Sequence, residues 1–214
     1  NYQKVFGLSP VWKGEHKELG TANSIFNFKN TYFELLSAKG EGLGAALVND
    51  AIQKNGEGLT GIVFGTENID KVTRVLKDKG YMVNDPSIGE GTNSDNQSIR
   101  TWKNLFLPPE LTRGLFSFII EHTQGQLPSI ESYPDTAFNK LDHVVINTND
   151  ADGFIDIYKN EFDIRLALDK VIEHWNTRIL FFRLNETTIE VVAKEHNNKN
   201  PDELWGLAWE VESI

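Results

Sequence analysis

Internal repetition constrains the fold of this chain more than any other feature of its sequence. A short apolar strand, followed by Asn or Asp and a helix-like stretch, opens three segments that begin at residues 59–64, 141–146 and 204–209. A second pattern recurs where such segments end, at residues 28–36 and 184–192 and, more loosely, at 115–121. The constant order of opening strand, helix and ending strand argues against chance and predicts stacked modules that share a core.

The elements of each module follow from the spacing of apolar residues. Ile69, Val72 and Leu76 recur at helical spacing, with Asn68 as the expected N-cap and Gly80 as the stop. A second helix is expected after Asp150, and residues 102–106 and 179–184 are rich in strand-forming side chains. Each complete module therefore has the order βαβββ, and the polar segment 84–97 is expected to be a long connection.

These modules predict an α+β fold, in which repeated βαβββ modules form cupped mixed β-sheets with helices outside. Residues 1–128 are expected to form a first domain, which holds the end of module one (1–40) and module two (56–124). Residues 129–139, with Pro134, form the expected linker. Residues 140–214 form the second domain, with module three at 140–195 and the first strand of module four at 203–214. Both end modules look truncated.

Composition excludes several classes of function. The formal net charge is −10, from 31 acidic and 21 basic residues, which disfavours binding to nucleic acid or to an anionic membrane. There is no cysteine, so disulfides, thiolate metal ligands and a cysteine nucleophile are absent. No apolar run approaches the roughly 18 residues of a membrane span, and no signal peptide is visible. A cytoplasmic protein is the expectation.

Single charged residues stand out in otherwise apolar strands. Glu34, Glu121 and Glu190 each interrupt such a strand, and His143 shares one strand face with Leu141 and Val145. Burial of an unpaired carboxylate is costly, and a metal or a cationic partner would relieve that cost. The alternative is that each glutamate lies at a strand end or meets an arginine such as Arg100 or Arg178. The alternative for His143 is a buried imidazole that bonds a backbone carbonyl.

A second group of residues suggests a binding surface. Arg100, Trp102, Asn104 and Phe106 alternate on one strand face, which suits an anionic or planar ligand, although a surface strand with an aromatic ladder fits equally. We expect Asn23 at the mouth of the same site. His16 and His174 each follow a glutamate on the expected second strand of a module, and His16 is a candidate acid or base whose alternative is a solvated position. His122 is expected to point away from the site because it neighbours Glu121.

Several of these segments resemble a known family. Residues 14–16 (Gly-Glu-His), 20–23 (Gly-Thr-Ala-Asn), 30–36, 102–110 and 141–145 are similar to the glyoxalase-like domain of the vicinal-oxygen-chelate superfamily, which includes glyoxalases, ring-cleaving dioxygenases and bleomycin-resistance proteins. The resemblance implies paired modules around a divalent metal (Zn, Fe, Mn, Ni or Co). It implies His143, Glu190 and Glu121 as metal ligands, and Glu34 and Glu190 as proton-transfer residues. Gly61 and Gly206 stand where further ligands are expected, which departs from the family pattern.

The resemblance implies a metal-dependent enzyme, of the lyase, isomerase or dioxygenase type, that acts on a small oxygenated metabolite. The alternative is a non-catalytic protein that sequesters a small ligand, as bleomycin-resistance members do. A structural or interaction domain is a third reading. Because modules of this superfamily often pair between chains, a homodimer is expected.

Overall fold

The computed structural model describes residues 1–134, 137–194 and 202–211, in two compact units. Unit 1 holds Asn1–Phe28, Tyr32–Thr112 and Phe116–Pro134, and unit 2 holds Lys29–Thr31, Arg113–Leu115 and the described residues from 137 onward. The expected ends of modules three and four, at 195 and 212–214, lie outside the described residues.

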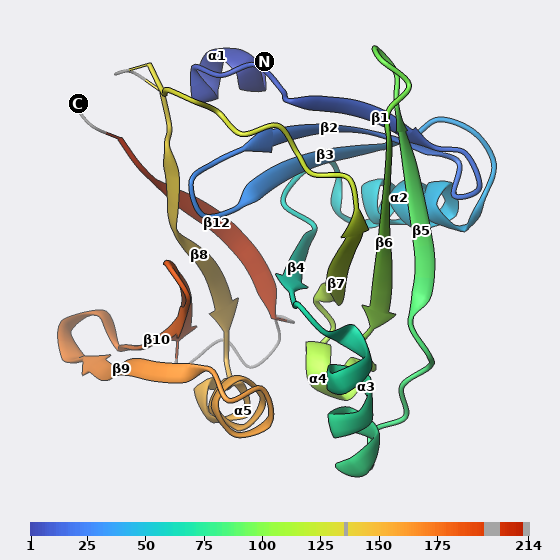
Figure 1. The fold of residues 1–214 in the computed structure, drawn as a ribbon. Coiled ribbons are helices and arrows are strands. Elements are labelled where there is room, and N and C mark those ends of the chain that lie inside the picture. The colour runs from blue at the N-terminus through green and yellow to red at the C-terminus, as the bar shows by residue number, and fades with distance from the viewer. Residues whose placement is uncertain (135–136, 195–201, 212–214) are drawn as a thin grey trace. The chain divides into compact units, whose positions relative to one another are not determined.

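Unit 1 is built on one mixed sheet of seven strands, shown in blue to green in Figure 1. Its strands are β1 (Trp12–His16), β2 (Thr21–Asn27), β3 (Tyr32–Ala38), β4 (Gly61–Gly65), β5 (Ser87–Asn93), β6 (Ile99–Phe106) and β7 (Phe116–Gln124). They are arranged in the order β3-β2-β1-β5-β6-β7-β4, and β4 runs parallel to β7. Strands β4 to β7 with helix α3 (Ile69–Asp78) form one βαβββ module.

The sheet of unit 1 curls so strongly that distant strands face each other. Four strands separate β3 from β7, so a flat sheet would place them roughly 24 Å apart. The hydroxyl of Tyr32 on β3 nevertheless lies 3.5 Å from Nε2 of His122 on β7. Figure 1 shows the same curl, with β1 to β3 running across and β5 to β7 running down. The face that carries Tyr32 and His122 is therefore the inside of a cup, here called the unit 1 cup.

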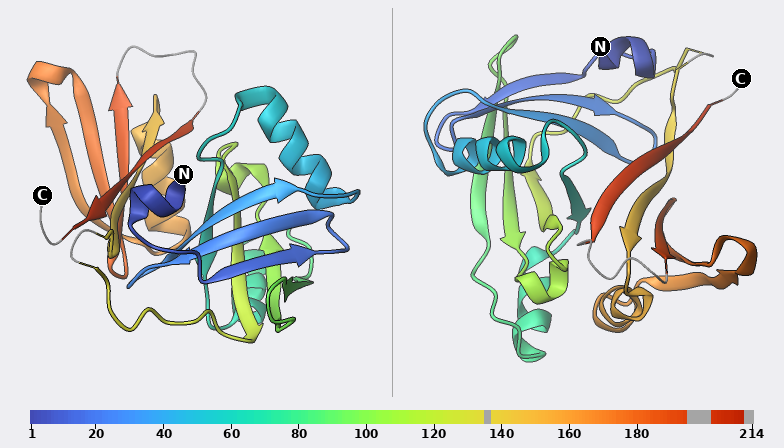
Figure 2. Two further views of the ribbon diagram at one scale, coloured as in Figure 1. Left: turned by 90° about the horizontal axis from the view of Figure 1, so that it is seen from above. Right: turned by 180° about the vertical axis from the view of Figure 1, so that it is seen from behind.

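Helices pack along this sheet. Helix α3 packs on β6 and β7, and helix α2 (Leu43–Asn55) packs on β3 (Figure 2). Helices α1 (Tyr2–Phe6) and α4 (Pro109–Thr112) are single turns. The predicted N-cap of α3 is confirmed, since Asn68 Oδ1 accepts a hydrogen bond from the Lys71 backbone N–H at 2.8 Å.

The prediction that residues 84–97 form a connection is wrong, because β5 lies within them. Its glycines have a packing role that composition alone hides. A Cβ atom at Gly89 would lie 2.3 Å from Nε1 of Trp102, and one at Gly91 would lie 3.2 Å from both His16 and Trp102. The Trp102 indole thus covers the β5 backbone, and only glycine leaves it room.

Unit 2 repeats the module around a five-stranded sheet of order β12-β8-β11-β10-β9. Its elements are β8 (Lys140–Thr148), α5 (Ala151–Phe154), the wide helical turn η1 (Ile155–Glu161), β9 (Arg165–Ile172), the short turn η2 (Glu173–Trp175), β10 (Thr177–Leu184), β11 (Thr187–Lys194) and β12 (Glu203–Glu210). Strand β8 runs parallel to β11, as the opening and closing strands of a βαβββ module do. His174 lies in η2 and not on a strand, so that prediction is wrong.

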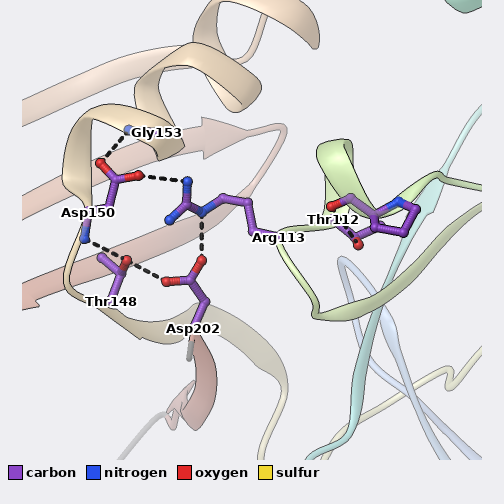
Figure 3. A network of polar contacts seen from close by, with 7 residues as sticks. Thr112, Arg113, Thr148, Asp150, Gly153 and Asp202 are labelled. Atoms are coloured by element: carbon purple, nitrogen blue, oxygen red, sulfur yellow. Dashed lines mark hydrogen bonds and ion pairs between the residues drawn. The ribbon is translucent and has the colours of Figure 1, made fainter. Parts of the chain in front are cut away.

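A polar network within unit 2 joins the ends of three segments (Figure 3). Arg113 donates from Nε to Asp202 at 2.6 Å and from Nη1 to Asp150 at 2.9 Å. Asp150 caps α5 by accepting from the Gly153 backbone N–H at 3.0 Å, and Thr148 donates to Asp202 at 2.5 Å. The side chain of Asp202 is only 5% exposed, so Arg113 neutralises a carboxylate that has little access to water.

The predicted fold class is confirmed: the chain is α+β, with curled mixed sheets and few helices. Among the described residues, no helix is long and apolar enough to cross a membrane.

Candidate functional site

Strand alternation places a compact set of polar side chains inside the unit 1 cup. Residues that are paired on neighbouring strands point to the same face of the sheet. The register pairs Gly14 with Asn23 and Asn93, Ile25 with Glu34, and Trp102 with His122, so these polar side chains share one face. The members of this set, which comes from β1, β2, β3, β6 and β7, are His16, Asn23, Tyr32, Glu34, Arg100, Trp102, Asn104 and His122. Six of the residues that the sequence singled out thus lie on one concave surface: His16, Asn23, Glu34, Arg100, Trp102 and Asn104.

Arg100 provides the positive charge of the cup. The residue is 5% exposed, its guanidinium carbon lies 5.3 Å from the Trp12 ring centre, and its Nη2 lies 3.3 Å from Nδ1 of His122. No carboxylate of the described residues forms an ion pair with it, and its buried Nε has no hydrogen-bond partner among them. Burial lowers the pKa of Arg100, while Tyr32 and Glu34 oppose that shift. A buried guanidinium with an open donor is suited to binding an anion.

Glu34 provides the carboxylate. Its Oε1 accepts a hydrogen bond from Asn23 Nδ2 at 2.7 Å. The residue is exposed to solvent, while neighbouring atoms remove part of the hydration of its carboxylate. This partial desolvation raises the pKa of Glu34, and the Asn23 hydrogen bond and the Arg100 charge counteract the rise. A carboxylate whose pKa is raised is a stronger proton acceptor than an ordinary surface glutamate.

His122 belongs to the cup, and the prediction that it points away is wrong. Arginine carries only donors, so Nδ1 of His122 must accept from Arg100, which leaves the proton on Nε2, toward Tyr32. Burial and the Arg100 charge lower the pKa of His122, which keeps the imidazole neutral. Burial and the nearby Glu34 raise the pKa of Tyr32 to about 12. Alternation groups His122 with Phe118 and Ile120, but it does not show which face of the strand lies inside the cup.

His16 is also held in the cup. It is 6% exposed, its Nδ1 lies 2.8 Å from the Thr21 hydroxyl, and its ring meets Trp102 edge to face at 5.4 Å. Burial, followed by the Arg100 charge, lowers its pKa. The solvated alternative for His16 does not hold.

Glu121 faces the opposite side of β7 from His122. Its Oε2 accepts a hydrogen bond from the Ile69 backbone N–H at 2.7 Å, at the first turn of α3. The carboxylate therefore stabilises the helix N-terminus and lies outside the cup. Glu121 was expected to be a metal ligand, but its side chain faces α3 and not the cup.

Unit 2 brings together the pair on which the metal prediction depended. His143 and Glu190 lie on neighbouring parallel strands, and Nε2 of His143 is 3.2 Å from Oε2 of Glu190. The other ring nitrogen, Nδ1, lies 2.8 Å from Asp142, which fixes the orientation of the imidazole. On the same face, Arg183 donates a hydrogen bond to Thr188.

The two units differ in how well they suit a divalent cation. In the unit 1 cup, His122 contacts the Arg100 guanidinium directly, so that donor set does not fit a metal ion. In unit 2, His143 and Glu190 fit two positions of a coordination sphere. Within the described part of the chain, no three His, Asp or Glu side chains gather closely enough to hold a metal. Gly61 adds no ligand and has no space for one, since a Cβ atom there would meet the Phe116 ring at 2.7 Å.

Comparisons with known proteins address the family and the fold. A family model described as a glyoxalase-like domain matches residues 1–139. A search of curated proteins found no match. The crystal structure of a hypothetical protein from Staphylococcus aureus is similar, with a TM-score of 0.67 and 15% identity, over 90% of this chain and 79% of that one. At this identity the likeness shows the fold alone.

Two further structures resemble only part of the chain. A Streptomyces coelicolor methylmalonyl-CoA epimerase in complex with 2-nitronate-propionyl-CoA matches with a TM-score of 0.43 and 24% identity, over 57% of this chain and 85% of that one. Methylmalonyl-CoA epimerase from Mycobacterium tuberculosis matches with a TM-score of 0.33 and 19% identity, over 38% of this chain and 61% of that one. These likenesses are too low to carry an argument. The family model covers well over half of the chain, which therefore belongs to the glyoxalase-like domain family.

Proposed function

We propose that the unit 1 cup binds a small oxygenated anion through Arg100 and transfers a proton next to its carbonyl group through Glu34. The observation that carries this proposal is the set of buried polar atoms that lack partners among the described residues. Of the four such atoms, Asn23 Oδ1, Arg100 Nε and Asn104 Oδ1 all belong to the cup. Each buried unpaired polar atom costs about 1–3 kcal/mol. An anion accepts hydrogen bonds, so it recovers this cost at the Arg100 Nε–H, whereas the two amide oxygens require a donor group on the ligand.

The residues of the cup suit proton transfer at a carbon atom. The Glu34 carboxylate takes the proton from a C–H group beside a carbonyl, and the C–H electron pair moves into the enolate. The Arg100 guanidinium balances the negative charge on the enolate oxygen. Return of the proton from Glu34 to the same or a neighbouring carbon completes an isomerisation. His16 and His122, both neutral, donate or accept hydrogen bonds without adding charge.

Proton exchange into a simple keto acid tests this proposal. Pyruvate is incubated with the protein in D2O, and loss of its methyl proton signal is followed by NMR. We expect catalysed exchange by the unaltered chain, and a loss of about 100-fold or more in Glu34→Gln, since general bases typically contribute factors of 10²–10⁴. Exchange at the uncatalysed rate by the unaltered chain would refute the catalytic proposal.

A binding measurement beside the exchange experiment distinguishes the catalytic proposal from the non-catalytic alternative. Calorimetric titration with pyruvate measures binding without chemistry. Saturable binding that Arg100→Met abolishes, together with no exchange, supports a sequestering protein. The absence of any binding would refute both proposals.

We infer a second candidate in unit 2, where His143 and Glu190 provide two ligands for a divalent metal. The 3.2 Å contact between them supports this proposal, as does the orientation of His143 by Asp142. Such a metal would supply Lewis acidity to an oxygenated ligand. Calorimetry with Zn²⁺ and Mn²⁺ tests it. We expect binding by the unaltered chain and loss in His143→Ala, whereas His174→Ala serves as the control; equal binding by His143→Ala would exclude the pair.

A further inference from the structure

Beyond the polar set, the unit 1 cup carries an exposed row of aromatic side chains. Phe106 on β6 and Phe116 and Phe118 on β7, here called the phenylalanine row, alternate in phase with Arg100 and His122 and so share their face. Ring centres are 5.4 Å apart for Phe106 and Phe118, and 5.8 Å apart for Phe116 and Phe118. Phe106 is 51% exposed and Phe116 is 41% exposed.

The phenylalanine row is not part of the core that holds unit 1 together. On β6 and β7 most of that core lies on the other face, where Leu105 is 1% exposed and Ile119 is 8% exposed, while Ile120 is the buried apolar residue of the cup face on β7. Phe118, between them, is half-buried. Two exposed aromatic rings joined by a half-buried one on a concave surface are typical of a ligand-binding wall. They therefore require an occupant other than the fold itself.

The row and the Arg100 end of the cup are continuous. His122 lies four positions after Phe118 on β7, which corresponds to roughly 13 Å, and Trp102 and Phe106 are four positions apart on β6. Asn104 and Ile120 are paired on this face between the two ends, and Ile120 is 8% exposed. One end of the surface is cationic and the other is apolar.

We propose that the cup takes an amphipathic anion: a carboxylate head bound at Arg100, and an unbranched apolar chain that extends along β6 and β7 to the phenylalanine row. This inference rests on the proposed function, because it uses the same anion site, and it adds the class of substrate. The charge at one end and the aromatic wall at the other match the two halves of such a molecule. A second copy of the chain would match only the apolar end.

A series of n-alkanoates tests the inference with the whole chain. Butanoate, hexanoate, octanoate and decanoate are titrated calorimetrically. Each added methylene group that becomes buried is expected to raise the affinity by up to about fourfold, from roughly 0.8 kcal/mol per group. Phe106→Ala should leave butanoate binding unchanged and lower decanoate affinity by about 10-fold or more. Ile88→Ala, which removes an exposed side chain from the opposite face of β5, is the matched control.

The outcomes are distinct. Butanoate binding that depends on Arg100 but does not strengthen with chain length would overturn this inference and leave the proposed function intact. No binding of any member would overturn this inference, and no binding of pyruvate either would overturn the proposed function as well. Equal binding of the whole series to Arg100→Met would overturn both. If light scattering shows that Phe106→Ala changes the molecular mass in solution and leaves decanoate affinity unchanged, the row is a contact between copies and the inference fails. Because the length series uses the unaltered chain, it remains decisive even if Phe106→Ala does not fold.

Discussion

Replacement of Arg100 by methionine separates a functional arginine from a structural one. The substitution removes the cation–π contact with Trp12, worth about 0.5–2 kcal/mol, and the charged contact with His122, worth about 1.5–3 kcal/mol. It also removes two costs of the folded state: an unpaired buried Nε, which costs about 1–3 kcal/mol, and a charge that is withdrawn from water. These contributions oppose each other. We therefore expect the free energy of unfolding to change by no more than about 1–2 kcal/mol, while pyruvate binding is lost.

Urea denaturation followed by circular dichroism measures the change. Arg113→Met is the matched comparison, since Arg113 pairs with the buried Asp202, and removal of one partner of a buried pair costs about 3–5 kcal/mol. If Arg100→Met loses as much stability as Arg113→Met, Arg100 is a structural residue, and the argument that its open donor awaits a ligand is refuted.

Three further predictions concern the same unit. Glu34→Gln should stabilise the chain at pH 7, because folding raises the pKa of Glu34 and so disfavours its ionised form in the folded state. This gain in stability should disappear below pH 4.5, the ordinary pKa of glutamate, and urea midpoints measured across pH would show it. Asn23→Ala removes a hydrogen bond that lowers the pKa of Glu34, so the acid limb of the exchange rate should move to higher pH. Gly89→Ala places a Cβ atom 2.3 Å from the Trp102 indole and should cost about 1–3 kcal/mol or more and shift the tryptophan emission.

Each of these has its own control. Gly65→Ala adds a methyl group where no atom lies within 4 Å, and a loss as large as that of Gly89→Ala would contradict the packing argument. A stability gain from Glu34→Gln that persists unchanged at pH 3 would contradict the electrostatic one. An unaltered acid limb in Asn23→Ala would show that this amide does not tune Glu34.

The modular architecture could be predicted because it depends on local signals. Apolar spacing identified α3, and Asn68 and Asp150 cap helices as expected. The strand β5 was missed because its sequence is rich in Gly, Asn and Ser, which usually marks loops. The cause is long-range: the Trp102 ring on the next strand excludes any side chain at Gly89.

The sequence identified most of the residues of the candidate site but did not show how all of them come together. Alternation grouped Arg100 with Trp102 on one face, whereas the family resemblance brought together His143 and Glu190, which the structure places 3.2 Å apart. The error at His122 arose because alternation shows only that Glu121 and His122 point to opposite faces of the strand. Which of Glu121 and His122 faces the cup depends on pairing between β6 and β7, which no local pattern encodes.

An NMR titration of the ¹⁵N-labelled chain with pyruvate tests the anion site most directly. The account predicts saturable shifts of the indole N–H signals of Trp12 and Trp102, which lie around Arg100 and His16. The exposed indoles of Trp175 and Trp205 should not move, and Arg100→Met should abolish the response. Shifts confined to Trp175 or Trp205, or equal shifts in Arg100→Met, would contradict it.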